Sequence, residues 1–88
     1  MKNEVYGVLT FESTHHAISG EKIFKEAGLN FKTIPTPREI TSSCGLSIRF
    51  DIKDLEKAKE SIQGENLAIK GIYKMTKVDH RYSVELIN

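Results

Sequence analysis

The chain has 88 residues, of which 28% are charged and 39% hydrophobic, and its net charge is +1. This length fits one domain in the usual range of about 50–200 residues and excludes a two-domain enzyme with a cleft between lobes. The balance of charged and apolar residues is that of a globular protein and excludes a disordered chain. With 13 basic against 12 acidic side chains, we expect no bulk electrostatic binding to nucleic acid or to a membrane surface.

Two further features of the sequence bear on the compartment. Met1 is followed by a mixed segment rather than a continuous apolar run, so we expect no signal peptide. No stretch approaches the ~18 apolar residues that a membrane span requires. We therefore expect a cytoplasmic protein in which Cys44, the only cysteine, is a free thiol.

The first part of the chain predicts a buried strand followed by a helix. Residues 5–11 are apolar on both faces, as in a central strand, and Gly7 marks a point where another group packs closely. Apolar residues then recur at helical spacing over 14–27. Ser13 or Thr14 supplies the N-cap, because a hydroxyl can accept a hydrogen bond from an exposed N–H group of the first turn.

Two strands separated by a long loop are predicted next. Residues 29–34 alternate in hydropathy, which favours a half-exposed edge strand, and Pro35 and Pro37 end it. The loop that follows runs as far as Gly45, which is long for a hairpin, whose connections usually have about 2–5 residues. Alternation resumes over 46–51 and predicts a third strand.

The rest of the chain predicts a second helix, a fourth strand and a tail. The helix is capped by Asp51 or Asp54 and closed by Gly64, and a strand over 67–74 follows. The inward-facing residues of the helix are Ile52, Leu55, Ala58 and Ile62. Alternating residues of the tail predict either a fifth strand or pairing with another copy of the chain: His80, Tyr82, Val84 and Leu86.

This order of elements predicts an α+β fold, a ferredoxin-like βαββαβ sandwich with one antiparallel sheet and two helices on one face. We expect a single domain over 1–88, with a core over 4–74 and a C-terminal tail or extra strand over 75–88. In the usual strand order 4-1-3-2, the third strand lies beside the first. Residues 13–16 and 35–45 are then neighbours at one rim of the sheet.

Cys44 is the candidate for chemistry on that rim. A nucleophilic sulfur must be largely thiolate, and the pKa of a free cysteine, about 8.5, falls beside helix N-termini and cations. The predicted helix start and Arg38 supply both, and Gly45 leaves the backbone beside the sulfur uncovered. Hydroxyl donors to a sulfur anion precede the cysteine: Thr41, Ser42 and Ser43. The alternatives are a buried structural cysteine and, for Arg38 with Glu39, a solvated ion pair.

The helix start carries two histidines and two hydroxyls. Because adjacent residues on a helix diverge, His15 and His16 do not make a metal pair, and zinc needs three or four ligands. One of them is a candidate base or cationic neighbour for Cys44, the alternative being a histidine that caps or packs. Exposed first-turn N–H groups can also hold a small anion, unless Ser13 or Thr14 simply caps them.

Two segments carry a family resemblance: FESTHHA at 11–17 and IPTPREITSSCGL at 34–46. They resemble the DUF3343 family, described as "Putative Se/S carrier protein-like". The resemblance covers roughly residues 4–74. Further matches are Glu21, KEAG at 25–28 and, more weakly, GIY at 71–73.

The resemblance implies a protein that holds sulfur or selenium on its cysteine as a persulfide or selenopersulfide. That role falls on Cys44. The residues implied to shape the site are Arg38, Glu39, Ser43 and Gly45, and those implied to face it are Ser13, Thr14 and His15. The tail beyond Met75 departs from the compact pattern of the family, and no established enzymatic activity comes with the resemblance.

Three hypotheses of different classes follow, all closer to a carrier or binding protein than to a turnover enzyme. The first is a sulfur or selenium carrier whose partners are donor and acceptor proteins, with no cofactor, no metal, and no contact with nucleic acid or membrane. The second is a small non-covalent anion-binding or regulatory module with a structural Cys44. The third is a structural subunit joined to a partner by its tail, and a homodimer through the C-terminal tail is one such assembly.

Overall fold

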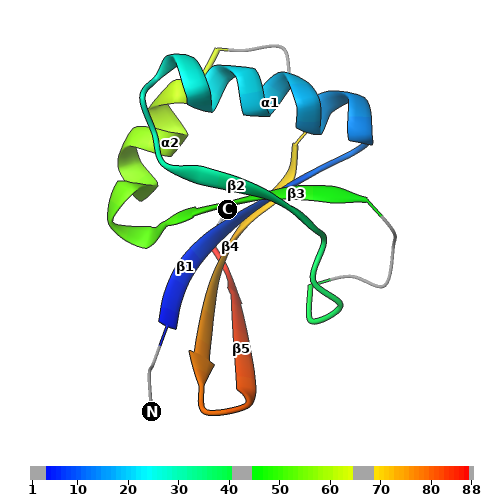
Figure 1. Ribbon diagram of the computed structural model, residues 1–88, viewed down its shortest axis with the longest axis vertical. Helices are drawn as coiled ribbons and strands as arrows, with labels where there is room; N and C mark the ends of the chain where they lie inside the picture. The colour runs from blue at the N-terminus through cyan, green and yellow to red at the C-terminus, as the bar shows by residue number, and fades with distance from the viewer. Residues whose placement is uncertain (1–3, 41–44, 65–68, 88) are drawn as a thin grey trace.

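A computed structural model describes residues 4–40, 45–64 and 69–87. The described chain is an α+β fold of one five-stranded antiparallel sheet and two helices (Figure 1). No helix in these ranges is long and apolar enough to cross a membrane. In chain order the elements are β1 (Glu4–Phe11), α1 (Thr14–Glu26), β2 (Phe31–Pro35), β3 (Leu46–Asp51), a 3-10 turn η1 (Ile52–Asp54), α2 (Leu55–Ile62), β4 (Ile69–Val78) and β5 (Arg81–Leu86).

The strands lie in the order β2-β3-β1-β4-β5. β1 is the central strand, as its apolar residues on both faces predict, and β3 lies beside it as expected, with Thr10 opposite Ser47. β2 is an edge strand, also as predicted, and the tail forms a fifth strand outside β4. The register between β1 and β3 therefore brings the end of β1 and the start of β3 to the same end of the sheet.

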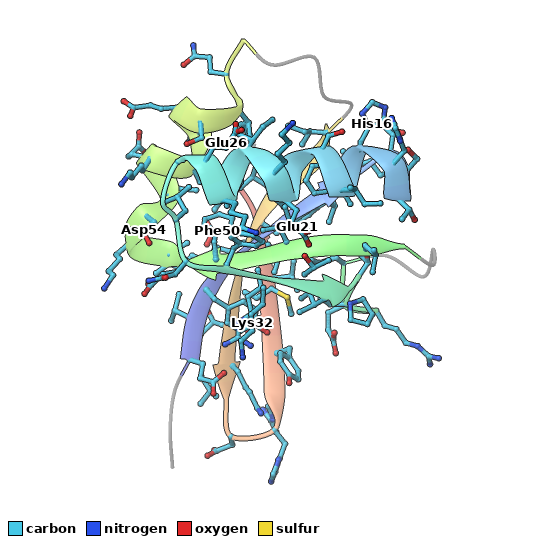
Figure 2. All side chains as sticks on the ribbon, turned by 45° about the horizontal axis from the view of Figure 1, so that its top comes forward. His16, Glu21, Glu26, Lys32, Phe50 and Asp54 are labelled. Atoms are coloured by element: carbon cyan, nitrogen blue, oxygen red, sulfur yellow. The ribbon has the colours of Figure 1, made fainter. Side chains whose placement is uncertain are left out.

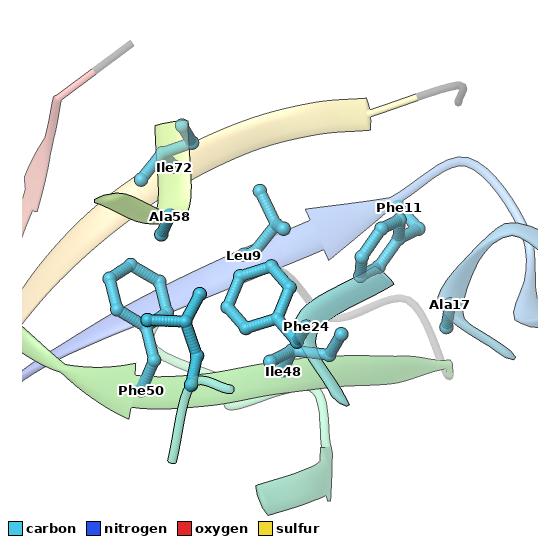
Figure 3. Close-up of a cluster of buried hydrophobic side chains, with 9 residues drawn as sticks. Leu9, Phe11, Ala17, Phe24, Ile48, Phe50, Ala58 and Ile72 are labelled. Atoms are coloured by element: carbon cyan, nitrogen blue, oxygen red, sulfur yellow. The ribbon is translucent and has the colours of Figure 1, made fainter. Parts of the chain in front are cut away.

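Both helices pack on one face of the sheet, where the main core lies (Figures 1 and 3). Phe24 of α1 is fully buried, and its ring lies 5.9 Å from that of Phe31 and 5.8 Å from that of Phe50, between centroids. A Cβ on Gly7 would lie 2.3 Å from the Phe50 ring, which confirms the predicted close approach. Other members of this core are Leu9, Phe11, Ala17, Leu29, Ile48, Ala58 and Ile72.

The opposite face of the sheet carries no helix of the described chain, and we call it the open face (Figure 1). Its buried apolar residues are Tyr6, Val8 and Met75, against which Val84 of β5 also packs. The guanidinium carbon of Arg49 lies 3.9 Å from the centre of the Tyr6 ring. The open face is thus an apolar strip with a cation stacked on its aromatic residue.

One of the two predicted helix caps is confirmed and the other is not: Asp51 caps the second helix start, whereas α1 has no side-chain cap. α1 begins after Ser13, but the expectation of a hydroxyl cap is wrong, because the Ser13 side chain makes no capping hydrogen bond. Its carbonyl instead accepts from the N–H groups of His16 and Ala17, and water can hydrate the other groups of an exposed helix end. The second helix begins with the 3-10 turn, where the Asp51 carboxylate accepts from the Lys53 N–H at 3.3 Å.

The fourth strand runs further than predicted. The sequence predicted an end at Lys74, whereas β4 continues to Val78 because β1 pairs with it as far as Lys77 and β5 as far as Val78. The predicted start of this strand falls on residues outside the described ranges. Asp79, at φ 58, and His80 form the turn of the β4–β5 hairpin, so His80 does not share a strand face with Tyr82.

Candidate functional site

The loop whose sequence contains Cys44 is closed at its base by two cross-strand contacts. The Thr36 N–H donates to the Gly45 carbonyl at 3.0 Å, which continues the ladder one pair beyond Pro35 and Leu46. The hydroxyls of Thr36 and Ser47 lie 2.6 Å apart, and Ser47 is fully buried. Both ends of the loop are therefore fixed to the rim where β1 also ends.

Ile40 attaches the first half of the loop to the open face. Its N–H donates to the Pro37 carbonyl at 3.0 Å, which closes a turn directly after β2. The Ile40 side chain packs against the cluster of Tyr6, Val8 and Met75. The turn between Pro37 and Ile40 is thus bound to the sheet by apolar contact as well as by the chain.

Thr36, Ile40 and Ser47 were not among the residues that the sequence singled out. A signal for one of them was present, since Ile40 is the only branched aliphatic residue between Pro35 and Gly45. An apolar side chain in a polar loop is often the residue that packs against the core. Thr36 and Ser47 carry no comparable signal, because their hydroxyl pair depends on the strand register.

Arg38 and Glu39 lie in this turn with exposed side chains. No ion pair joins them in the part of the chain that the structure describes. Burial raises the pKa of Tyr6 above its usual value, the Arg49 guanidinium opposes that shift, and Glu39 adds a smaller upward contribution. The charge of Glu39 therefore acts on Tyr6 of the open face.

Gly45 is half-buried at the base of the loop. Among the described residues, a Cβ built on it would meet only the Thr36 hydroxyl oxygen, at 3.8 Å, which is an ordinary contact. Its φ lies outside the left-handed region, so the backbone does not require a glycine here. Within the described ranges, neither a contact nor the backbone conformation requires this glycine, and its role in leaving the backbone beside Cys44 uncovered stays a prediction.

Four residues of the predicted site, Thr41, Ser42, Ser43 and Cys44, lie outside the described ranges. In the sequence they are bracketed by Ile40, which packs on the open face, and by Gly45 at the rim. An approach of Arg38 or of the α1 start to the cysteine sulfur stays a prediction.

The start of α1 lies at the same end of the sheet as the start of β3 (Figure 1). Ser13, Thr14 and His15 are exposed there. The rings of His15 and His16 meet edge to face with centroids 5.8 Å apart, and Figure 2 shows His16 at the beginning of the helix. In the described ranges, no three His, Cys, Asp or Glu side chains gather as a metal site.

Comparison with known proteins places this chain in a family. No curated protein and no solved structure matches it. The sequence model of the family described as "Putative Se/S carrier protein-like" matches residues 6–74, from β1 into β4. That range contains both segments of the rim and leaves β5 outside. Because the match spans more than half of the 88 residues, the chain belongs to the "Putative Se/S carrier protein-like" family.

Proposed function

We propose that this protein carries sulfur or selenium on Cys44, as a persulfide or selenopersulfide, and delivers it to a partner protein. The observation that supports this most directly is the family match, whose range of 6–74 includes the only cysteine of the chain. A carrier of this kind needs a reactive thiol and no cofactor of its own. The residues proposed around Cys44 are Arg38, Glu39, Ser42, Ser43, Gly45, Ser13, Thr14 and His15.

Loading would be the transfer of one sulfane sulfur from a donor persulfide. The Cys44 thiolate attacks the outer sulfur of R–S–SH, an S–S bond forms on Cys44, and the S–S bond of the donor breaks. The donor leaves as the thiolate R–S⁻, so no net oxidation occurs. Delivery repeats the step with an acceptor thiolate as nucleophile and Cys44 as leaving group, and selenium follows the same scheme with R–S–SeH.

Three features of the described residues support a transfer site at this rim. The loop is tied at Thr36 and Gly45 and packed at Ile40, so the segment between has fixed end points on a rigid sheet. The surrounding side chains of Arg38 and His15 are exposed, which suits access by a partner protein. A guanidinium in the same loop is a cation that can favour the thiolate over the thiol.

We also infer a ferredoxin-like sandwich for the unit that ends with β4. The pairing β2-β3-β1-β4 and the two helices on one face support this, with β5 as an addition at the edge. The tied loop and the α1 start then occupy the same rim for a topological reason, because β1 leads into α1 where β3 begins.

The test begins with the pH dependence of Cys44 alkylation in the folded protein, with free cysteine as reference. We expect fast labelling with a midpoint well below ~8.5, and slower labelling in Arg38→Gln and His15→Gln, which keep a polar side chain. A small-molecule persulfide should then add one sulfur atom to the protein mass, and a thiol acceptor should remove it. Labelling that appears only on unfolding would contradict the proposal.

Cys44→Ser separates the carrier from the non-covalent alternative. The α1 start has no acidic residue in its first turn and no side-chain cap, which is the feature that an anion-binding module would use. If sulfate or selenite binds equally to the wild type and to Cys44→Ser while persulfide loading fails in both, the binding module replaces the carrier.

A further inference from the structure

We propose that the outer edge of β5 is a self-association surface, where the β5 strands of two copies pair antiparallel and join their sheets. This is independent of the carrier function, since β5 lies outside the residues that the family matches. β5 is the last strand of the sheet, and one of its two edges pairs with β4. Figure 1 shows it at the border of the sheet, in a hairpin that extends away from both helices.

The outer edge of β5 presents a regular row of hydrogen-bonding groups. The Ile87 N–H donates to the Ile72 carbonyl at 2.8 Å, which fixes the alternation of the β4–β5 ladder. Because antiparallel residues alternate between the two sides, the outward N–H and C=O groups belong to Tyr82, Val84 and Leu86. Such a row is a template for another strand.

The other edge of the sheet, on β2, is less suited to pairing with another strand. The bond from Thr36 to Gly45 sets the alternation there, so the outward groups belong to Phe31, Thr33 and Pro35. Pro35 has no N–H to donate. The Thr33 hydroxyl donates to the carboxylate of Glu21, which Figure 2 shows pointing from α1 toward the strands. The described part of β5 has neither a proline nor a side-chain hydrogen bond to a helix. Of the two edges, the β5 edge is therefore the one open to pairing.

The side chains of β5 are complementary to those of a second, reversed β5. With the two-fold axis at Ser83, Arg81 of each copy lies opposite Glu85 of the other, which gives two pairs of opposite charge. The same register places Tyr82 opposite Val84, and both residues have outward backbone groups, so these pairs are hydrogen-bonded. The parity of the ladder allows this register, and the charges of Arg81 and Glu85 select it among the allowed ones.

The apolar residues on β5 favour a second copy over a solvated edge. Tyr82 is 41% exposed and Leu86 63% exposed. Both lie on the open face with Val84, which already packs against the cluster of Tyr6, Val8 and Met75. In the paired state the open-face strips of the two copies would be continuous. A second copy supplies the reversed Arg and Glu spacing that this register requires.

The test combines oligomeric state with a register-specific crosslink. Sedimentation of the wild type over a concentration series should show a reversible monomer–dimer equilibrium. In a Cys44→Ser background, Ser83→Cys should form a disulfide dimer on oxidation, because a non-hydrogen-bonded antiparallel pair has Cα atoms about 4.5 Å apart, within disulfide range. Glu85→Cys is the matched control on the same strand face, since its two copies would lie about 13 Å apart at ~3.3 Å per residue.

Charge reversal tests the register without a cysteine. Arg81→Glu should weaken the dimer about tenfold, because two like-charge pairs replace two attractive ones. Adding Glu85→Arg to this variant should restore most of the affinity, because each pair again joins opposite charges. Glu85→Arg alone also places an arginine opposite Lys74 of β4 within the same copy. Its dimer affinity is therefore interpreted together with its own unfolding midpoint. A monomer at every concentration, equal crosslinking of the two cysteine variants, or no recovery in the double reversal would overturn the proposal.

Discussion

The hydroxyl of Thr36 lies 2.6 Å from the hydroxyl of Ser47, across the base of the loop that contains Cys44. Ser47 is fully buried and sits between β1 and β2, opposite Thr10 on one side and Ile34 on the other. The pair thus joins Thr36, the first residue after β2, to Ser47 of β3, the strand that follows the loop. A polar contact inside the sheet therefore sets where the candidate site begins and ends.

Removing one hydroxyl of this pair should cost more than removing both. Thr36→Val keeps the shape of the side chain but leaves the buried Ser47 hydroxyl without this partner, and we expect a loss of about 1–3 kcal/mol. Thr36→Val with Ser47→Ala should recover much of that loss, because neither polar group is then stranded. Urea unfolding measures both, and equal losses in the single and double variants would contradict the coupling.

The sequence predicted best the features that depend on local pattern. The apolar run around Gly7 identified the central strand and its close contact, and Phe50 is the ring that uses the space. Prediction from the sequence failed for features that depend on pairing between distant segments. The length of β4 is set by its two neighbours, and the contact of Ile40 with the open face requires a loop that turns back under the sheet.

Gly45→Ala separates a role in folding from a role at the thiol. In the described part of the chain, the added methyl group would meet only the Thr36 hydroxyl, at 3.8 Å, so we expect the unfolding free energy to change by less than about 0.5 kcal/mol. If the uncovered backbone gives reagents access to Cys44, alkylation should slow. Gly28→Ala is the matched control: its φ of 75 is costly for alanine, so it should lose about 1 kcal/mol without slowing alkylation. Unchanged alkylation in Gly45→Ala would contradict the access role.

Ile40→Ala tests whether packing on the open face holds the loop in its reactive arrangement. The side chain is half-buried against the cluster of Tyr6, Val8 and Met75, so its loss should cost about 1–2 kcal/mol. We expect the pH midpoint of Cys44 alkylation to move toward that of free cysteine. Ile62→Ala removes a half-buried isoleucine from the main core and should destabilise without moving the midpoint. A shift in both variants would mean that general loosening is the cause.

Gly7→Ala should be among the most damaging small changes in the sheet. A Cβ would lie 2.3–2.9 Å from three carbons of the Phe50 ring, which is itself packed against Phe24. We expect a loss of about 1–3 kcal/mol, as for other overpacked cores. Phe50→Leu frees the space, so Gly7→Ala should cost less in that background than in the wild type. Thermal or urea unfolding of the four proteins of this cycle gives the coupling, and additive losses would contradict the steric cause.

Tyr6 makes the stability of the fold depend on pH in the alkaline range. Burial, opposed by Arg49, raises its pKa in the folded state above the value of about 10 in the unfolded chain. The folded protein then holds this proton at a pH where the unfolded chain has lost it. The contribution to stability is complete below pH ~10 and is lost as the pH rises through the folded-state pKa.

Urea midpoints measured from neutral pH into this range should therefore fall less steeply in Tyr6→Phe than in the wild type. Tyr73→Phe, which also removes a phenol from the open face, is the matched control. Arg49→Gln should shift the decline to higher pH, because the cation over the ring favours the phenolate. The same slope in Tyr6→Phe as in the wild type would show that the alkaline loss of stability arises elsewhere.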